Sequence, residues 1–148
     1  MMAILGVGTD VVDVPSFTEQ LELPGSRLRE VFTARERRRA AQRAADLEGE
    51  ADASPRHLAA IWALKEAFIK AWSGALVGVA PPLARDEVSW PDIEVRHDAW
   101  GRPSISLRGK VWEWVRNSLG VSSPDDLSLH ASASHDGDIA CALVVLEK

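Results

Sequence analysis

The sequence predicts an α+β fold in which a central long helix packs on a small, mainly antiparallel sheet, all within a single domain of residues 1–148. Three observations support this. One helical pattern runs from Ser54 to Gly74, strand-like runs of β-branched residues lie near both ends of the chain, and a turn joins two short strand patterns between them. A chain of 148 residues, 46% of them hydrophobic, is long enough for one substantial core.

The long helix is marked at both ends and along one side. Ser54 suits the N-cap, Pro55 suits the first helical position, and Gly74 can take the left-handed conformation that ends a helix. Apolar residues recur at spacings of three and four, which predicts a broad stripe that faces a core. The members of the stripe are Leu58, Ile61, Leu64, Ala67, Phe68 and Ala71.

Charged residues in this apolar helix are unusual. Glu66 and Lys70 stand four residues apart and therefore project from roughly the same side, beside Lys65. One interpretation is an ordinary ion pair on a solvated face, worth a few tenths of a kcal/mol. The other is a metal-binding carboxylate beside a phosphate-binding lysine, and it requires partners elsewhere in the chain.

The first strand, residues 3–14, offers such a partner. Gly6 and Gly8 would allow close approach by a neighbouring backbone or a ligand, and alternation places Asp10 on their face. A carboxylate inside an apolar strand must be paired, hydrogen-bonded or bound to a metal. Asp10 is thus either a site residue or a solvated aspartate, whereas Asp13 is expected to cap a helix that begins near Pro15.

The remaining elements follow in order. A short helix is expected over 15–23, and a second begins at Thr33, where Glu36 completes a capping box. Residues 46–54 read as a mobile loop and 75–91 as a long irregular connection. Then come a β-hairpin (93–97 and 104–107), a helix (110–119), a strand (127–134), a tight turn (135–138) and a buried closing strand (139–146).

Two residues near the C-terminus have competing interpretations. His135 sits where a strand enters a turn, and it is either structural or part of a site at the strand end. The only cysteine, Cys141, reads as a small buried hydrophobe, which excludes a disulfide framework and a zinc site.

We also expect no membrane span and no signal peptide, and hence a soluble cytoplasmic protein.

The charge is unevenly distributed. The net charge of −5 argues against general nucleic-acid binding, yet arginines crowd into residues 27–43. These arginines form either a solvated helical face or a docking surface for an acidic partner. They are Arg27, Arg29, Arg35, Arg37, Arg38, Arg39 and Arg43.

Three separated segments together resemble the signatures of holo-acyl-carrier-protein synthases, the small class of phosphopantetheinyl transferases. They are GVGTDVVDV at 6–14, WALKEAFIKAW at 62–72 and SASHDGDIACALVV at 132–145, with weaker matches in FTARE at 32–36 and GRP at 101–103. The resemblance implies transfer of the 4'-phosphopantetheine arm of coenzyme A to a serine of an apo acyl carrier protein, for fatty acid synthesis.

The resemblance also assigns roles by position. Asp10 and Glu66 would hold Mg²⁺ on the coenzyme A pyrophosphate, Lys70 would contact that phosphate, Lys65 would line the site, and His135 would lie near the nucleotide's phosphates. Two carboxylates with phosphate oxygens and water suit Mg²⁺, and phosphoryl-type transfer depends on positioning and charge neutralisation. The base that takes the serine proton is either Glu66 or a metal-bound water.

For the carrier protein, the resemblance places docking on the early basic helices, collectively Arg27, Arg35, Arg38 and Arg39. It further implies a homotrimer with active sites between subunits. The chain departs from the family pattern in two places: Ile61 stands where many relatives carry arginine, and SGALVGVAPP replaces a glycine-threonine-glycine turn.

Two other functions use the same residues. A Mg²⁺-dependent phosphohydrolase of nucleotides or coenzyme A would need the carboxylates but no carrier protein. A non-enzymatic interaction module would use the basic helix to bind an acidic protein, with Asp10 and Glu66 merely structural.

Overall fold

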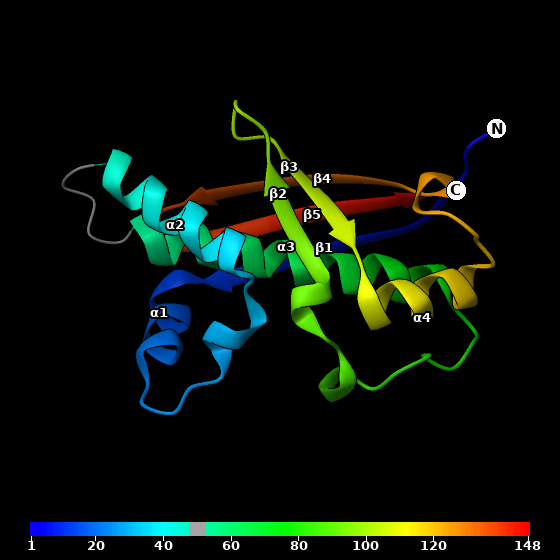
Figure 1. Cartoon of the computed structure of the whole chain (residues 1–148), viewed down its shortest axis with the longest axis horizontal. Coiled ribbons are helices and arrows are strands. Elements are labelled where there is room, and N and C mark those ends of the chain that lie inside the picture. Colours follow the sequence, from blue (N-terminus) through cyan, green and yellow to red (C-terminus); the bar gives the residue numbers. More distant parts are fainter. Residues whose placement is uncertain (48–52) are drawn as a thin grey trace.

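A computed structural model describes residues 1–47 and 53–148, and it confirms the predicted α+β fold (Figure 1). The helices are α1 (Val14–Glu22), α2 (Ala34–Asp46), α3 (Ala53–Ala75) and α4 (Gly109–Leu119). The strands are β1 (Ile4–Asp13), β2 (Ile93–His97), β3 (Pro103–Leu107), β4 (Ser128–Asp136) and β5 (Ile139–Glu147). Within the described ranges, short 3-10 turns lie at Leu28–Val31, Arg85–Glu87, Trp90–Asp92 and Pro124–Asp126.

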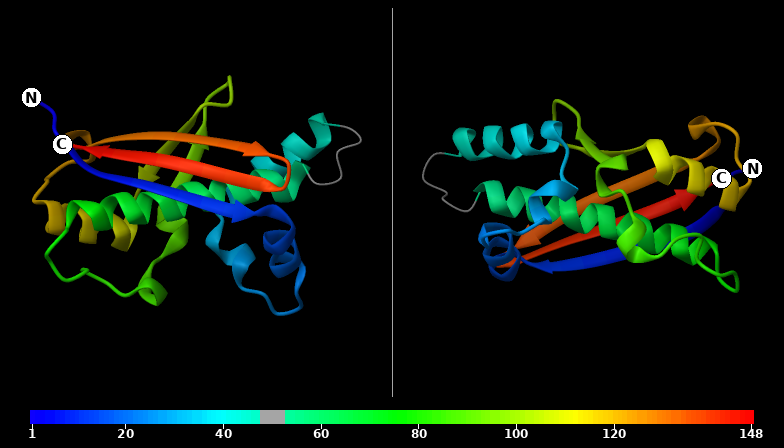
Figure 2. Two further views of the ribbon diagram at one scale, coloured as in Figure 1. Left: turned by 180° about the vertical axis from the view of Figure 1, so that it is seen from behind. Right: turned by 60° about the horizontal axis from the view of Figure 1, so that its bottom comes forward.

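The main sheet has three antiparallel strands in the order β1-β5-β4, so the two ends of the chain meet in it. Helix α3 packs along one face, and the β2-β3 hairpin lies beside β4. The opposite face of the sheet is covered by no described element, as the view from behind shows (Figure 2). Register places Asp10 beside Ala142, and Ala142 beside Ala133 on β4, all on the α3 face.

The closest packing in the fold is between β1 and α3. A Cβ added to Gly8 would lie 1.9 Å from the carbonyl oxygen of Ala67, and one added to Gly6 would lie 2.0 Å from that of Ala71. Neither distance leaves room for a methyl group, so only glycine permits this contact. The sequence predicted that either a neighbouring backbone or a ligand approaches these glycines, and the structure shows the backbone of α3.

Helix α3 carries the core, as its apolar stripe predicts, since Ile61, Leu64 and Phe68 are all buried. Both predicted end signals are wrong. The helix begins at Ala53, which places Ser54 and Pro55 inside its first turn. Gly74 remains helical because it packs against the backbone of β1, and the first left-handed glycine after the helix is Gly78.

The two early caps are confirmed. Asp13 accepts a hydrogen bond from the Ser16 amide (3.1 Å) and caps α1. At the start of α2, the Thr33 hydroxyl accepts from the Glu36 amide (3.2 Å) while the Glu36 carboxylate accepts from the Thr33 amide (2.8 Å). This reciprocal arrangement satisfies two backbone donors that the helix itself leaves unpaired.

Glu36 also takes part in an interior ion pair that the sequence did not predict. Its carboxylate lies 3.1 Å from the ammonium of Lys65 and accepts a hydrogen bond from the Val95 amide (2.8 Å). The Lys65 ammonium also donates to the carbonyl oxygens of Val31 (2.8 Å) and Trp90 (3.0 Å). Both side chains are fully buried, and their bonds satisfy a pair that would otherwise be costly to bury.

The later elements match their predictions with two corrections. The hairpin, the irregular connection after α3 and helix α4, which ends at left-handed Gly120, are confirmed. Strand β5 is buried on one face only, since Ile139 and Leu143 are exposed on the other. Cys141 is half-buried on that outer face, 3.3 Å from the Ser134 hydroxyl, rather than in the core. The predicted loop at 46–54 lies mostly outside the described residues.

Over the two described ranges, no helix is both long and apolar enough to cross a membrane.

Gly8→Ala should destabilise the protein strongly, because the new methyl group would overlap the backbone of α3. We expect a loss of about 3 kcal/mol in the free energy of unfolding, measured by urea denaturation. Gly74→Ala is the matched control: its Cβ would make only ordinary contacts (3.8 Å), so helix propensity should stabilise it by up to about 1 kcal/mol. Equal effects at both positions would show that the β1–α3 approach can relax.

Candidate active site

Asp10 lies where β1 passes α3, on the face predicted for it. Its Oδ1 is 2.9 Å from the Nζ of Lys70, so the strand and the helix are joined by an ion pair at this point. The Asp10 side chain is largely buried, whereas that of Lys70 is half exposed. The carboxylate and the lysine predicted from distant segments are thus brought together.

Glu66 lies one turn before Lys70 but does not pair with it. Arg85, from the connection after α3, engages both carboxylate oxygens: Nη1 donates to Oε2 (2.9 Å) and Nη2 donates to Oε1. The Glu66 side chain is 6% exposed and that of Arg85 is 68% exposed. These hydrogen bonds to Glu66 raise the pKa of Arg85, and Asp10 adds to the effect by its charge.

Arg85 was missed in the sequence because nothing in its surroundings marks it. It lies 19 residues after Glu66, in an irregular segment without periodicity, and no spacing rule relates the two. Its charge faces Glu66 directly and also acts on Asp10. The two carboxylates therefore share one small region at the edge of the sheet, and each is already balanced by a basic side chain.

Two carboxylates from separate elements form a donor set that suits Mg²⁺. This hard ion takes one or two carboxylates and fills its other positions with phosphate oxygens and water. Within the described parts of the chain, no group of three or more histidine, cysteine, aspartate or glutamate side chains is arranged to hold a metal. Any metal here would thus take its further ligands from water or from a phosphate-bearing substrate.

Lys65 does not line this site, and that expectation is corrected. Its side chain turns into the core, where it is completely buried against Glu36. Burial lowers the pKa of Lys65, and the charge of Glu36 opposes that shift. Lys65 therefore has a structural role, although it adjoins Glu66 in sequence.

His135 lies in a second, separate pocket. The pocket holds about 190 Å³ between α2, α3 and the β3–β4 edge. Four other basic side chains line it: Arg39, Arg43, His57 and His97. The rings of His57 and His97 lie 5.1 Å apart, centroid to centroid.

This basic pocket is suited to an anion. Burial and the neighbouring positive charges of His97, Arg43 and Arg39 lower the pKa of His57 to about 4, and burial with the same arginines lowers that of His97. Among the described residues, the buried Nε of Arg39 and Nε2 of His57 have no hydrogen-bond partner. A buried N–H without a partner is costly, and an anion bound at the Nε–H of Arg39 would satisfy it.

The two charged clusters lie on opposite sides of α3. Nine residues separate His57 from Glu66, which is about two and a half helical turns, so their side chains leave the helix in opposite directions. Asp10 is on the edge strand β1 and His135 on the other edge strand, β4. Within one chain, the structure therefore does not bring His135 together with Asp10, Glu66 and Lys70.

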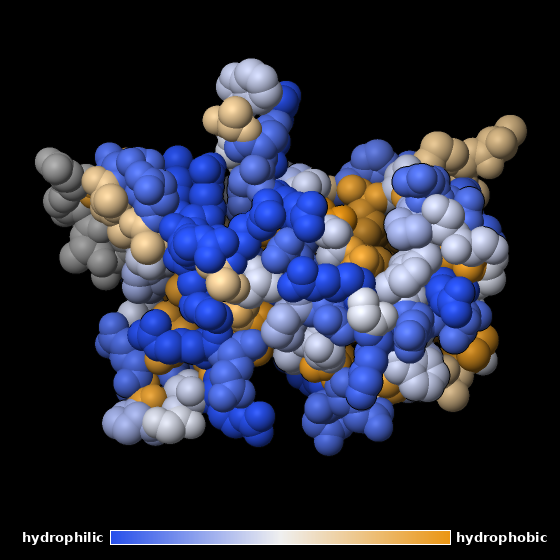
Figure 3. Space-filling view, in the orientation of Figure 1, coloured by the Kyte–Doolittle hydropathy of each residue, from blue (hydrophilic) through white to orange (hydrophobic). Residues whose placement is uncertain are grey.

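The arginines proposed for docking differ in exposure. Arg27 is exposed and pairs with Glu30 (3.0 Å), and Arg35 is exposed and lies 3.9 Å from Glu94. Arg38 is exposed, whereas Arg39 is half-buried against the basic pocket. Figure 3 shows hydrophilic side chains gathered over α2, the helix that carries three of the four.

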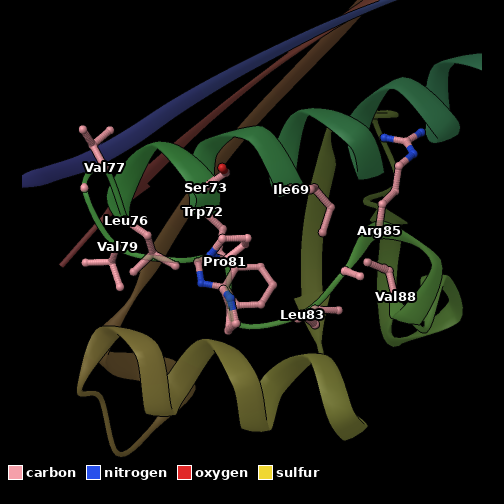
Figure 4. Close-up of a pocket in the computed structure, with 13 residues that line it drawn as sticks. Ile69, Trp72, Ser73, Leu76, Val77, Val79, Pro81, Leu83, Arg85 and Val88 are labelled. Carbon is pink, nitrogen blue, oxygen red and sulfur yellow. The ribbon is translucent and has the colours of Figure 1, made fainter.

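An apolar cavity of about 510 Å³ lies beneath the connection after α3. Ile69, Trp72 and Leu76 line it from the helix, and Pro81 and Leu83 line it from the connection (Figure 4). Arg85 stands at one end, beside Val88. Ile61 faces the core instead and offers no polar contact to either cluster.

Comparisons with known proteins identify the family. Residues 6–144 match the model of the 4'-phosphopantetheinyl transferase superfamily. The holo-[acyl-carrier-protein] synthase of Corynebacterium glutamicum is 48% identical over 97% of this chain and 98% of its own length. That of Mycobacterium tuberculosis (strain H37Rv) is 42% identical over 99% of this chain and 98% of its own length.

A solved structure agrees with these matches. The ACPS–CoA complex of Chronobacterium ammoniagenes superposes with a TM-score of 0.83 at 43% identity, covering 99% of this chain and 96% of that one. Because sequence and fold agree over nearly the whole chain, the protein belongs to the 4'-phosphopantetheinyl transferase superfamily, among the holo-[acyl-carrier-protein] synthases.

Proposed function

We propose that this protein transfers the 4'-phosphopantetheine arm of coenzyme A to a serine of an apo acyl carrier protein, with Mg²⁺, in the cytoplasm, for fatty acid synthesis. The observation that carries the proposal is the cluster of Asp10, Glu66 and Lys70 at the β1–α3 contact of a chain in this family. The printed names of the relatives, which include a complex with coenzyme A, support the same substrates.

Asp10 and Glu66 would hold the magnesium ion, since they are the carboxylates that meet at this edge of the sheet. When bound, the ion would neutralise charge on the coenzyme A diphosphate and fix its position. Lys70 would contact the same diphosphate, because its half-exposed ammonium already lies at Asp10. Asp10 comes from a strand and Glu66 from a helix, which fixes the two carboxylates relative to each other.

The reaction needs one proton acceptor and charge neutralisation. The serine oxygen attacks the phosphorus that carries the pantetheine arm, a new P–O bond forms, and the bond to adenosine 3',5'-bisphosphate breaks with its electron pair. The serine proton goes to a base at the site, where Glu66 is the adjacent carboxylate. Lys70 offsets the charge that builds up on the transferred group and on the leaving bisphosphate.

The two charged clusters would be combined by assembly into a homotrimer. In one chain they face away from each other across α3, so His135 of one copy would reach the diphosphate cluster only of a neighbouring copy. The uncovered face of the sheet supplies an apolar surface for that contact, with Val7, Val11 and Leu143 all exposed on it. The basic pocket around His135 would then take the nucleotide's phosphates.

The exposed arginines on and before α2 would dock the acidic carrier protein. Arg27, Arg35 and Arg38 are exposed on the side where a partner's carboxylates would meet them, while Arg39 would contribute mainly through the basic pocket. Oppositely charged surfaces speed encounter and fix orientation more than they add affinity.

Glu66→Gln should reduce transfer by about a hundredfold or more, because it removes the negative charge on which a cation depends. The measurement is the mass of an apo carrier protein incubated with coenzyme A and Mg²⁺, with Glu113→Gln on the exposed side of α4 as the control. Undiminished transfer by Glu66→Gln would remove this residue from the site. Release of adenosine bisphosphate without any gain of carrier mass would indicate a phosphohydrolase instead.

Arg38→Glu should raise the KM for the carrier about tenfold at low salt and leave the KM for coenzyme A unchanged, since only docking is altered. The difference should shrink as salt is added. Arg116→Glu, an equal change of charge on α4, is the control. Similar KM values for both variants would mean that α2 is simply a solvated helix.

Leu143→Asp should break the assembly, because a carboxylate buried in an apolar interface has no partner there. Light scattering after size exclusion should give three times the chain mass for the natural protein and the single-chain mass for the variant. Leu23→Asp, at an exposed position away from the sheet, should keep the larger mass. A single-chain mass for the natural protein would contradict the homotrimer.

A further inference from the structure

Arg85 engages both oxygens of the Glu66 carboxylate. Its guanidinium takes both oxygens of Glu66, whereas Lys70 contacts only Oδ1 of Asp10. The two-point contact is the stronger arrangement, since a guanidinium matches the geometry of a carboxylate. The inference that follows rests on the proposed function of Glu66 as a metal ligand. It concerns what happens to the Arg85–Glu66 contact when a metal binds.

We expect a divalent cation and the Arg85 guanidinium to compete for Glu66. Mg²⁺ binds a carboxylate oxygen at about 2.1 Å and holds a full octahedral shell around itself. On the side of the carboxylate that Arg85 faces, that shell and the guanidinium would need the same space. The two cations would also repel each other strongly at such a short separation.

Glu66 is fixed, whereas Arg85 is placed to move. Glu66 lies in the middle of the long helix and is almost completely buried. Arg85 is two-thirds exposed, on a three-residue turn within the irregular connection, and its guanidinium carbon lies 5.7 Å from the centre of the Trp90 ring. The same side chain forms one end of the apolar cavity (Figure 4).

We infer that Arg85 is the resident cation of the metal site: it neutralises Glu66 in the metal-free protein and is displaced when a divalent cation binds. A carboxylate as buried as Glu66 would be costly without a partner, so the guanidinium stabilises the metal-free fold. Once displaced, Arg85 lies within reach of the substrate diphosphate, which a guanidinium binds well. Arg85 thus lowers the affinity of Glu66 for a metal ion until the substrate diphosphate binds the guanidinium instead.

The test is calorimetric titration of the full chain with Mg²⁺ in the absence of coenzyme A. Arg85→Gln should bind Mg²⁺ about tenfold more tightly than the natural protein, because no guanidinium has to be displaced. Arg85→Lys keeps the charge but loses the two-point contact, so its Kd should lie between the two. Arg116→Gln removes a remote positive charge and should leave the Kd unchanged.

Two further measurements separate this role from general charge effects. In a Glu66→Gln background, adding Arg85→Gln should no longer tighten metal binding, because the two residues act through one contact. Mg²⁺ should also change the tryptophan fluorescence of the natural protein as Arg85 leaves Trp90, and Trp90→Phe should remove most of that change. Equal Kd values for Arg85→Gln and the natural protein, or weaker binding by the variant, would overturn the inference.

The outcome is independent of the transfer assay. If the natural protein modifies a carrier while Arg85→Gln leaves the Kd for Mg²⁺ unchanged, the role of Arg85 is wrong and the proposed function stands. If no carrier gains mass but the affinities change as expected, Arg85 is the resident cation of a metal site with another function.

Discussion

The site depends on how closely α3 approaches β1. Gly6 and Gly8 let the helix carbonyls come so near the strand that even a methyl group would overlap them. Asp10 follows on the same face of the strand, so the same contact brings its carboxylate to Lys70. Larger residues at the glycines would lift the helix away and separate the two carboxylates. The packing of two backbones thereby sets the spacing of the charged groups.

Patterns along the chain predicted most of the elements, because hydrophobic periodicity and capping residues act locally. The capping box at Thr33 and Glu36 and the face that Asp10 shares with the glycines are of this kind. The predicted C-terminal end of α3 was wrong because packing against β1 outweighs the preference of Gly74 for a turn. Local patterns also do not say which of two adjacent charged residues is in the core. Lys65 and Glu66 point to different sides of α3, and only the fold shows that Lys65 enters the core.

Interactions across irregular segments could not be read from the sequence at all. Arg85 reaches Glu66 from a connection without periodicity, and the pocket of His57, His97 and His135 combines three elements that no local pattern relates. Both the Arg85–Glu66 contact and the basic pocket are formed by charged or titratable side chains. Asp10 and Glu66 lie at one edge of the sheet, each with a basic partner, while in the positive pocket at the other edge the described Arg39 keeps an unpaired Nε–H. One chain thus presents two unequal charged surfaces that face in opposite directions.

The buried pair of Glu36 and Lys65 has a geometric consequence. Glu36 is part of the cap of α2 and Lys65 precedes Glu66 in α3, so a single interior contact fastens the arginine-bearing helix to the helix of the reacting centre. The two helices cannot slide past each other without stripping two buried charges of their partners. The position of the α2 arginines relative to Glu66 is therefore set by this contact in the core. Under the proposed docking on α2, a carrier would be aligned for transfer when its serine stands at the matching distance from its acidic surface.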